Sequence, residues 1–183
     1  MLSSVVVIGL LLIAGIVYYN KLIKYRNLVN EAWAGIDVQL QKRAELVPNL
    51  VQVVKGYAAH ESGVFEDVVR IRSNANADPD EAVAARAKHE TALSKSLSRL
   101  FALAEDYPDL KASEGFQQLH QSLVEIEDHL QFARRYYNGA TRDNNNAVQS
   151  FPSNIVANIF HFSQAEFFEI ELASQRAVPD VEL

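Results

Sequence analysis

The sequence predicts an all-α protein in which an N-terminal transmembrane helix continues into an antiparallel bundle of three to four long helices. Three observations support this fold class. The first twenty residues contain no charged side chain, apolar residues recur at helical spacing through most of the remaining chain, and no run of strand-like alternation competes with them. We therefore divide the chain into a transmembrane helix, residues 1–20, and a helical-bundle domain, residues 21–183.

The apolar segment from Leu2 to Tyr19 is long enough to cross a bilayer. As a helix its roughly 18 residues span about 27 Å, close to the thickness of the hydrocarbon core. Tyr18 and Tyr19 end the segment where aromatic residues gather at a membrane interface. A cleaved signal peptide is the alternative, but it requires a basic region, a shorter apolar core and a small-residue cleavage site. We therefore prefer a permanent anchor.

The charges beside the apolar segment predict its orientation. Lys21, Lys24 and Arg26 follow the segment directly, and no charged side chain precedes it. Because positive residues are retained on the cytoplasmic side, we expect a single-pass protein of the cytoplasmic membrane, with a short N-terminus outside and the C-terminal domain in the cytoplasm.

Composition narrows the classes of function. The formal net charge of −6 and the lack of a basic block interleaved with aromatic residues argue against nucleic-acid binding. The sequence has no cysteine, which excludes disulfides, thiol nucleophiles, thiolate metal sites and a lipid-attachment cysteine.

The first helix is expected to run on from the membrane segment without a break to Leu46. Its apolar residues recur in two rows of heptad spacing, typical of a coiled-coil-like seam, and Arg43 alone interrupts the first row. Pro48 lacks an amide hydrogen and predicts a kink or break at residues 46–49, after which the helical pattern resumes to about Arg72. The two rows consist of Leu22, Val29, Ile36, Leu50 and Tyr57, and of Trp33, Leu40, Val47 and Val54.

Residues 73–80 are predicted to form a turn before the next helix. Asp78 or Asp80 is available as its N-cap and Pro79 suits its first position. The helix is expected to reach Asp106, and residues 107–110 then interrupt the pattern. Its apolar row is Leu93, Leu97, Leu100 and Ala104, extended backward by Ala82 and Ala85.

A last long helix is predicted from Ser113, with apolar residues alternately three and four apart. After residues 143–146 and the Phe151-Pro152 pair, Ser153 is expected to cap a short helix through Ile159. The tail from Gln164 is interpreted as an acidic segment held by aromatic side chains. The apolar stripe of the long helix is Phe116, Leu119, Leu123, Ile126, Leu130, Ala133, Tyr137 and Ala140.

The search for catalytic motifs finds no established one. No His lies three residues after a Glu, HExxH is lacking, and there is neither a glycine-rich phosphate loop nor a G-x-S-x-G elbow. The nearest reactive constellation is His60, Glu61 and Glu66, joined by His120 or His129 from another helix; histidines bonding between helices are the simpler explanation. We expect no enzyme and no catalytic, cofactor-binding or metal-binding residue.

Three further groups each allow two interpretations, a binding surface or ordinary packing. Trp33 and Asp37 suit a partner face or a core position with its polar neighbour. Residues 134–138 suit phosphate or headgroup contact, or a helix turn with its basic side chains outward and Tyr137 inward. The third group is four phenylalanines that could contact a partner or the membrane interface, or could pack to close the end of the bundle. They are Phe160, Phe162, Phe167 and Phe168.

Specific strings in the sequence resemble the LemA family of bacterial membrane proteins. The resemblance covers nearly the whole chain after the anchor. The matching strings occupy residues 31–33, 36–40, 46–51, 54–61, 104–112, 133–138, 151–154 and 167–169, followed by Pro179 and Val181.

The resemblance implies an external N-terminus, a cytoplasmic domain of long helices and no established enzymatic activity. Two positions depart from the family pattern: Asn144 stands where an aromatic residue is usual, and His161 where a glycine is usual between two phenylalanines. Relatives of the family include proteins of bacterial membrane organelles, so membrane shaping or scaffolding follows by analogy.

Two functions are therefore carried forward. The preferred one is an anchored scaffold or membrane-organising protein that acts through helix-mediated self-association or partner recruitment. Its expected partners are the lipid bilayer, further copies of the chain and an unidentified protein, with no nucleic acid. The alternative is a regulatory or signalling accessory module, which binds a ligand or membrane client near Tyr137 and Asn138 and near His60 and Glu61.

Overall fold

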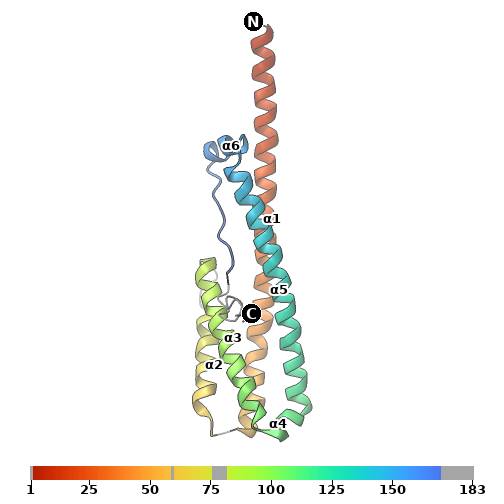
Figure 1. Ribbon diagram of the computed structural model, residues 1–183, viewed down its shortest axis with the longest axis vertical. Helices are drawn as coiled ribbons and strands as arrows, with labels where there is room; N and C mark the ends of the chain where they lie inside the picture. The colour runs from red at the N-terminus through yellow and green to blue at the C-terminus, as the bar shows by residue number, and fades with distance from the viewer. Residues whose placement is uncertain (1, 59, 76–81, 170–183) are drawn as a thin grey trace, which may run out of the picture. The chain divides into compact units, whose positions relative to one another are not determined.

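The protein is helical in a computed structural model that describes residues 2–58, 60–75 and 82–169 (Figure 1). Within these ranges there are six helices and no strand, which confirms the predicted all-α class. The helices are α1 (Leu2–Tyr57), α2 (Ser62–Ala75), α3 (Val83–Glu105), α4 (Pro108–Ala112), α5 (Glu114–Gln149) and α6 (Ser153–Ile159).

The chain forms two compact units. The first combines Met1–Asp37 with Gln131–Phe167, and the second combines Val38–Leu130 with Phe168–Leu183. Helices α1 and α5 each contribute to both units.

Helix α1 is continuous from Leu2 through Leu46, as predicted, but the break expected at residues 46–49 is wrong. The helix passes through Pro48 and ends at Tyr57. Proline at position 48 leaves the carbonyl of Ala44 without its helical donor. The Nε of Arg72, from α2, donates a hydrogen bond to that carbonyl at 3.1 Å. A side chain therefore replaces the missing amide, and the chain first leaves helical geometry after Tyr57.

The two heptad rows lie where the sequence places them. Their members are buried on both sides of Asp37, except Trp33, which is partly buried, and Tyr57, which is 46% exposed. Arg43, the interruption of the first row, is also buried, at 5% exposure. The regular spacing thus predicts the buried face of α1, and its one irregularity marks a buried charge.

At the start of α1 the apolar side chains are exposed instead of buried. The large apolar side chains from Val5 to Val17 are between 54% and 68% exposed. Among the residues that the structure describes, α1 alone is long and apolar enough to cross a membrane. A core helix of a water-soluble protein would bury these side chains, so the exposure favours a surface that faces lipid.

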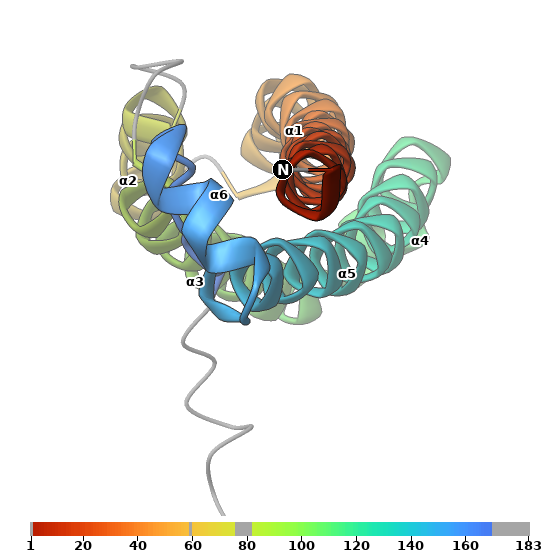
Figure 2. The same cartoon turned by 90° about the horizontal axis from the view of Figure 1, so that it is seen from above.

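The second unit is built around one apolar core. Helices α2 and α3 lie side by side and pack beside the C-terminal part of α1 (Figures 1 and 2). The predicted row of α3 is buried, but Ala82 is exposed and is itself the N-cap, without a side-chain hydrogen bond. The proposed capping residues Asp78, Pro79 and Asp80 lie outside the described residues.

Helix α5 carries the predicted apolar stripe and is longer than expected. Residues 143–146, which lie beyond the last residue of the predicted stripe, are still helical, and α5 continues to Gln149. Ser153 does not cap α6. It is the first residue of that helix, after Pro152, and its hydroxyl donates to the carbonyls of Ala147 at 2.6 Å and Ser150 at 2.8 Å.

Candidate functional site

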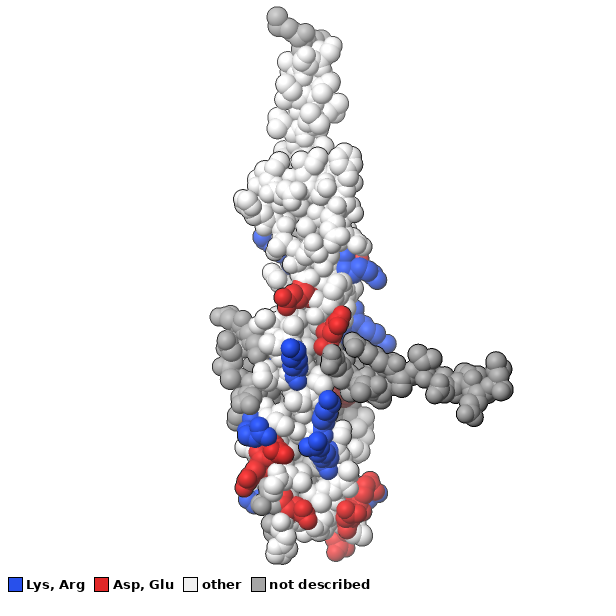
Figure 3. Space-filling model, turned by 60° about the vertical axis from the view of Figure 1, so that its left-hand side comes forward, with Lys and Arg blue, Asp and Glu red and all other residues white. Residues whose placement is uncertain are grey.

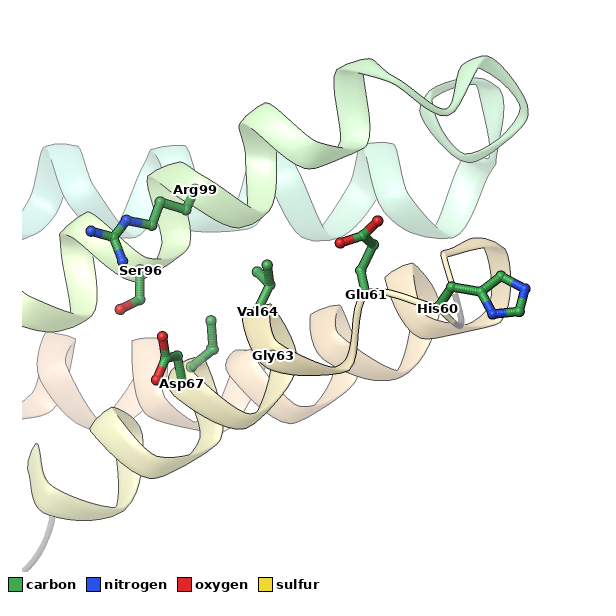
Figure 4. A pocket seen from close by; sticks show the side chains of 8 residues that line it. His60, Glu61, Gly63, Val64, Asp67, Ser96 and Arg99 are labelled. Atoms are coloured by element: carbon green, nitrogen blue, oxygen red, sulfur yellow. The ribbon is translucent and has the colours of Figure 1, made fainter.

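A groove in the second unit lies beside His60 and Glu61. It follows the end of α1, lies between α2 and α3, and has a volume of about 270 Å³. Figure 4 shows Asp67 of α2 facing Ser96 and Arg99 of α3, whereas the ring of His60 points away. One Asp67 oxygen also accepts a hydrogen bond from Arg70 at 2.7 Å. The groove is polar and carries charges of both signs.

The reactive constellation considered from the sequence is not brought together. His60 and Glu61 line the groove, but Glu66, His120 and His129 do not. His120 instead lies against the ring of Phe101, with centroids 4.7 Å apart. Among the described residues, no group of three or more His, Asp or Glu side chains is placed to hold a metal ion.

A buried charge network in the second unit was missed in the sequence. Nη2 of Arg43 donates to the Ser94 hydroxyl at 2.8 Å. Its Nη1 lies 3.4 Å from a carboxylate oxygen of Glu127 and 3.9 Å from one of Glu90. The signal was present, since Arg43 interrupts an apolar row, but its partners lie on α3 and α5 and no local pattern identifies them.

The environment of Glu90 favours its neutral form. Burial raises the pKa of the Glu90 carboxyl above its ordinary value, and the neighbouring charge of Glu127 acts in the same direction. The nearby charges of Arg43, Arg86 and His89 oppose this effect on the pKa without cancelling it. Because Arg43 and Glu90 are buried and only Glu127 reaches the surface, the network suits a role in fixing the register of three helices.

Tyr137 and its neighbours in the first unit form a packed aromatic centre. The Tyr137 hydroxyl donates to the carbonyl of Glu166 at 2.8 Å, and its ring lies 5.4 Å from that of Trp33 between centroids. Burial raises the pKa of Tyr137, with a smaller contribution from the charge of Glu166. Tyr137 points inward while Arg135 is exposed over the ring of Phe132, which agrees with the packing interpretation of residues 134–138.

Two buried asparagines hold the segment that follows α6 against α5. The side chain of Asn145 donates to the Ala165 carbonyl at 2.9 Å and accepts from the Ala165 amide at 2.8 Å. Asn144 donates to Asn145 at 3.2 Å and to the Ser163 carbonyl at 3.4 Å. Asparagine disfavours helix interiors because its side chain competes for backbone hydrogen bonds. These two residues use that capacity on a different segment.

The aromatic residues after α6 contact α1 at the end of its apolar segment. The ring of Tyr19 lies edge-on to Phe160 and Phe162, at centroid distances of 4.8 and 5.7 Å. The guanidinium of Arg26 lies 5.3 Å from the Phe162 ring. Phe162 is partly buried, Phe160 and Phe167 are exposed, and Phe168 is buried in the second unit. The four phenylalanines therefore do not form one row.

Comparison with known proteins gives relatives at low identity. The chain is 24% identical over 175 residues to Magnetosome protein MamQ 2 of Paramagnetospirillum magneticum, covering 82% of this chain and 64% of that protein. It is 23% identical over 174 residues to Magnetosome protein MamQ of Magnetospirillum gryphiswaldense, with the same coverage. It is 25% identical over 182 residues to Protein LemA of Metamycoplasma hominis, covering 91% of this chain and 82% of that protein.

The matches differ in how much of each relative they include. The alignments span less than two thirds of the length of the magnetosome relatives. The LemA family matches residues 32–183, which include the groove, the buried network and the asparagine pair. This chain, a helical protein with one candidate membrane helix, therefore belongs to the LemA family.

Proposed function

We propose that this protein is a non-enzymatic scaffold of the bacterial cytoplasmic membrane, anchored by a single pass of α1. It organises the membrane by self-association through its helices or by recruitment of a protein partner. The observation that carries this proposal is the continuity of α1, in which an exposed apolar segment becomes, without a break, a central helix of the packed domain. Such a helix couples the bundle directly to the bilayer.

The charges next to the apolar segment support the orientation. Lys21, Lys24 and Arg26 follow Tyr18 and Tyr19 closely, and the positive-inside rule favours a cytoplasmic bundle. Relatives that are named magnetosome proteins are compatible with a role in organising a bacterial structure. The charged residues of the Arg43 network are mostly enclosed, which suits a structural role better than a catalytic one.

Disulfide crosslinking in native membranes tests self-association. The natural chain has no cysteine, so it is its own control. Single substitutions Leu12→Cys and Ile16→Cys lie on exposed positions of the anchor. We expect oxidation to give a self-adduct at one or both positions. Monomer alone at every position, together with no partner adduct from a general amine crosslinker, would contradict the proposal.

A regulatory module that binds a ligand or membrane client is the second candidate. The polar groove at Glu61, Asp67 and Arg99 supports it. The burial of Tyr137 in ordinary packing counts against the second binding site of this hypothesis, near Tyr137 and Asn138. Arg99→Gln removes the positive charge of the groove, and Arg142→Gln removes an exposed positive charge elsewhere as the matched control. If a crosslinked client disappears only with Arg99→Gln, the regulatory function is favoured; unchanged adducts with both variants favour the scaffold.

A further inference from the structure

The segment around α6 lacks charge to an unusual degree for the surface of a cytoplasmic domain. From Asn144 to Ala165 the sequence contains no Asp, Glu, Lys or Arg, and His161 is its one ionisable side chain. Elsewhere after the anchor, acidic and basic residues are frequent. The segment mixes apolar residues with Asn, Ser and Gln, and its lack of charge lowers the cost of approaching an apolar environment.

Helix α6 has an inner and an outer side. Val156 and Ala157 are buried in a small cluster with Leu22 of α1. The outer side carries two isoleucines beside the uncharged Asn158: Ile155 is 51% exposed and Ile159, one turn later, is 64% exposed. Large apolar side chains that no other described residue covers are a mark of an interaction surface.

The outer side of α6 is extended by aromatic residues at both ends of the helix. Phe151 is 80% exposed and Phe160 is 55% exposed. We call these two residues, with Ile155 and Ile159, the α6 patch; within it, the ring of Phe160 also contacts Tyr19 of α1. Phenylalanine is typical of the apolar face of helices that lie in the boundary between headgroups and acyl chains.

The packing of α6 places the patch at the end of the proposed membrane span. The ring contacts of Tyr19 with Phe160 and Phe162, and the packing of Leu22 on Val156, fix α6 beside this part of α1 (Figure 1). In Figure 3 the upper part of the molecule, which includes the start of α1 and the level of α6, is free of coloured charged side chains on the face shown. The uncharged surface of the anchor thus continues onto α6.

We propose that the α6 patch is a second membrane contact, with α6 lying in the headgroup–acyl boundary of the cytoplasmic leaflet. The inference rests on the proposed anchoring of α1, because a helix packed on Tyr19, near the end of the proposed span, and on Leu22 just beyond it lies at the level of the leaflet boundary. The neighbouring Lys21, Lys24 and Arg26 suit anionic headgroups at the same level. A lipid surface therefore explains the apolar patch and the adjoining positive charges together.

This contact would make the protein asymmetric in the membrane. The anchor crosses both leaflets, whereas α6 and Phe151 add volume to the cytoplasmic leaflet alone. The hydrogen bonds of Ser153 to the carbonyls of Ala147 and Ser150 tie α6 to the end of α5, so the inserted element is joined to the bundle. A membrane-organising scaffold would gain a direct means of sensing or producing leaflet strain.

Site-specific fluorescence in the full-length protein tests the inference. Because the chain has no cysteine, an environment-sensitive NBD dye can be attached at one introduced position at a time. Ile159→Cys reports on the patch and Leu11→Cys on the membrane span. Phe132→Cys is the matched control, since Phe132 is a 64% exposed apolar residue in the same unit, about 25 Å along α5 from its end.

The proteins are reconstituted in phosphatidylethanolamine–phosphatidylglycerol vesicles. For dyes at residues 11 and 159 we expect blue-shifted emission, quenching by spin-labelled lipid and loss of quenching by iodide. The dye at residue 132 should remain accessible to iodide. If the dye at 159 behaves like that at 132 while the dye at 11 is in lipid, the inference fails and the anchor stands; if the dye at 11 is also in water, the anchoring proposal fails too.

A second copy of the chain is the competing occupant of the patch. In that case the dye at residue 159 would be shielded from iodide but not quenched by spin-labelled lipid, and the shielding would diminish on dilution of the protein among excess vesicles. This outcome would overturn the lipid contact. Lipid quenching that is independent of protein density is the result we expect.

Discussion

At the scale of single residues, the most informative position is Arg72. Its Nε takes the place of the amide hydrogen that Pro48 lacks, by donating to the carbonyl of Ala44. Arg72→Met removes this donor, and an unsatisfied, largely buried carbonyl costs about 1–3 kcal/mol. We expect the variant to lower the free energy of unfolding by that order, measured by denaturant titration in detergent micelles.

A double-mutant cycle separates this role of Arg72 from general packing. Pro48→Ala restores an amide that can donate to Ala44 within the helix. In that background Arg72→Met should cost clearly less than in the natural chain. An equal cost in both backgrounds would show that the hydrogen bond to Ala44 is not what Arg72 contributes.

His161 occupies a backbone conformation that suits glycine. Its φ is 56°, in the left-handed region where a Cβ atom is unfavourable. The resemblance to the LemA family already marked this position as one where glycine is usual. We expect His161→Gly to raise the free energy of unfolding by up to about 1 kcal/mol. His161→Ala keeps the Cβ and should give no such gain; equal effects of the two variants would point to the imidazole instead.

Glu90 predicts a particular dependence of stability on pH. Its pKa is raised in the folded state above the ordinary value of about 4.5, so the folded state binds the proton more tightly than the unfolded state. The contribution of Glu90 to stability is therefore fully present below pH 4.5 and is lost as the pH rises through the folded-state pKa. Stability should fall with rising pH across this window.

Glu90→Gln isolates that contribution because it cannot ionise. The difference in unfolding free energy, variant minus natural chain, should increase from below pH 4.5 toward neutrality. Arg43→Met should do the opposite, since loss of the positive charge raises the Glu90 pKa further and leaves a buried carboxyl with weaker compensation. A difference between Glu90→Gln and the natural chain that is constant with pH would contradict this account.

At the scale of elements, Asn145 shows how an extended segment is fixed to a helix. Asn145→Ala removes both hydrogen bonds to the backbone of Ala165. We expect faster hydrogen exchange at residues 163–167, with a loss of local stability of about 1–3 kcal/mol. Asn146→Ala is the matched control, because Asn146 is the exposed neighbour on the same helix and should leave the exchange of that segment unchanged.

The elements also show where sequence patterns succeed and where they stop. Heptad rows and the stripe of α5 predicted the buried faces well, because burial on a helix repeats with the helical period. Local signals failed at Pro48 and at Ser153. At Pro48 the side chain of Arg72, from another helix, donates to the carbonyl of Ala44, and the Ser153 hydroxyl donates to the carbonyl of Ala147 instead of capping α6.

In the candidate sites, too, the sequence predicts which side chains are buried but not which distant residues they contact. The inward position of Tyr137 and the outward position of Arg135 could be predicted from spacing alone. The partners of Arg43 could not, since Glu90 and Glu127 lie on other helices at no fixed sequence distance. The α6 patch needed the structure as well, because Ile155 and Ile159 would be ordinary core residues if α6 packed on its other side.

At the scale of the whole molecule, the central claim is a membrane-anchored scaffold that works through copies or partners. The most direct measurement is the mass of the intact assembly, released from native membranes by affinity capture and weighed by native mass spectrometry. We predict the mass of two or more copies of the 20.5 kDa chain, or the mass of the chain together with a defined protein partner. A single species at 20.5 kDa, under conditions that preserve a known membrane oligomer from the same preparation, would contradict the account.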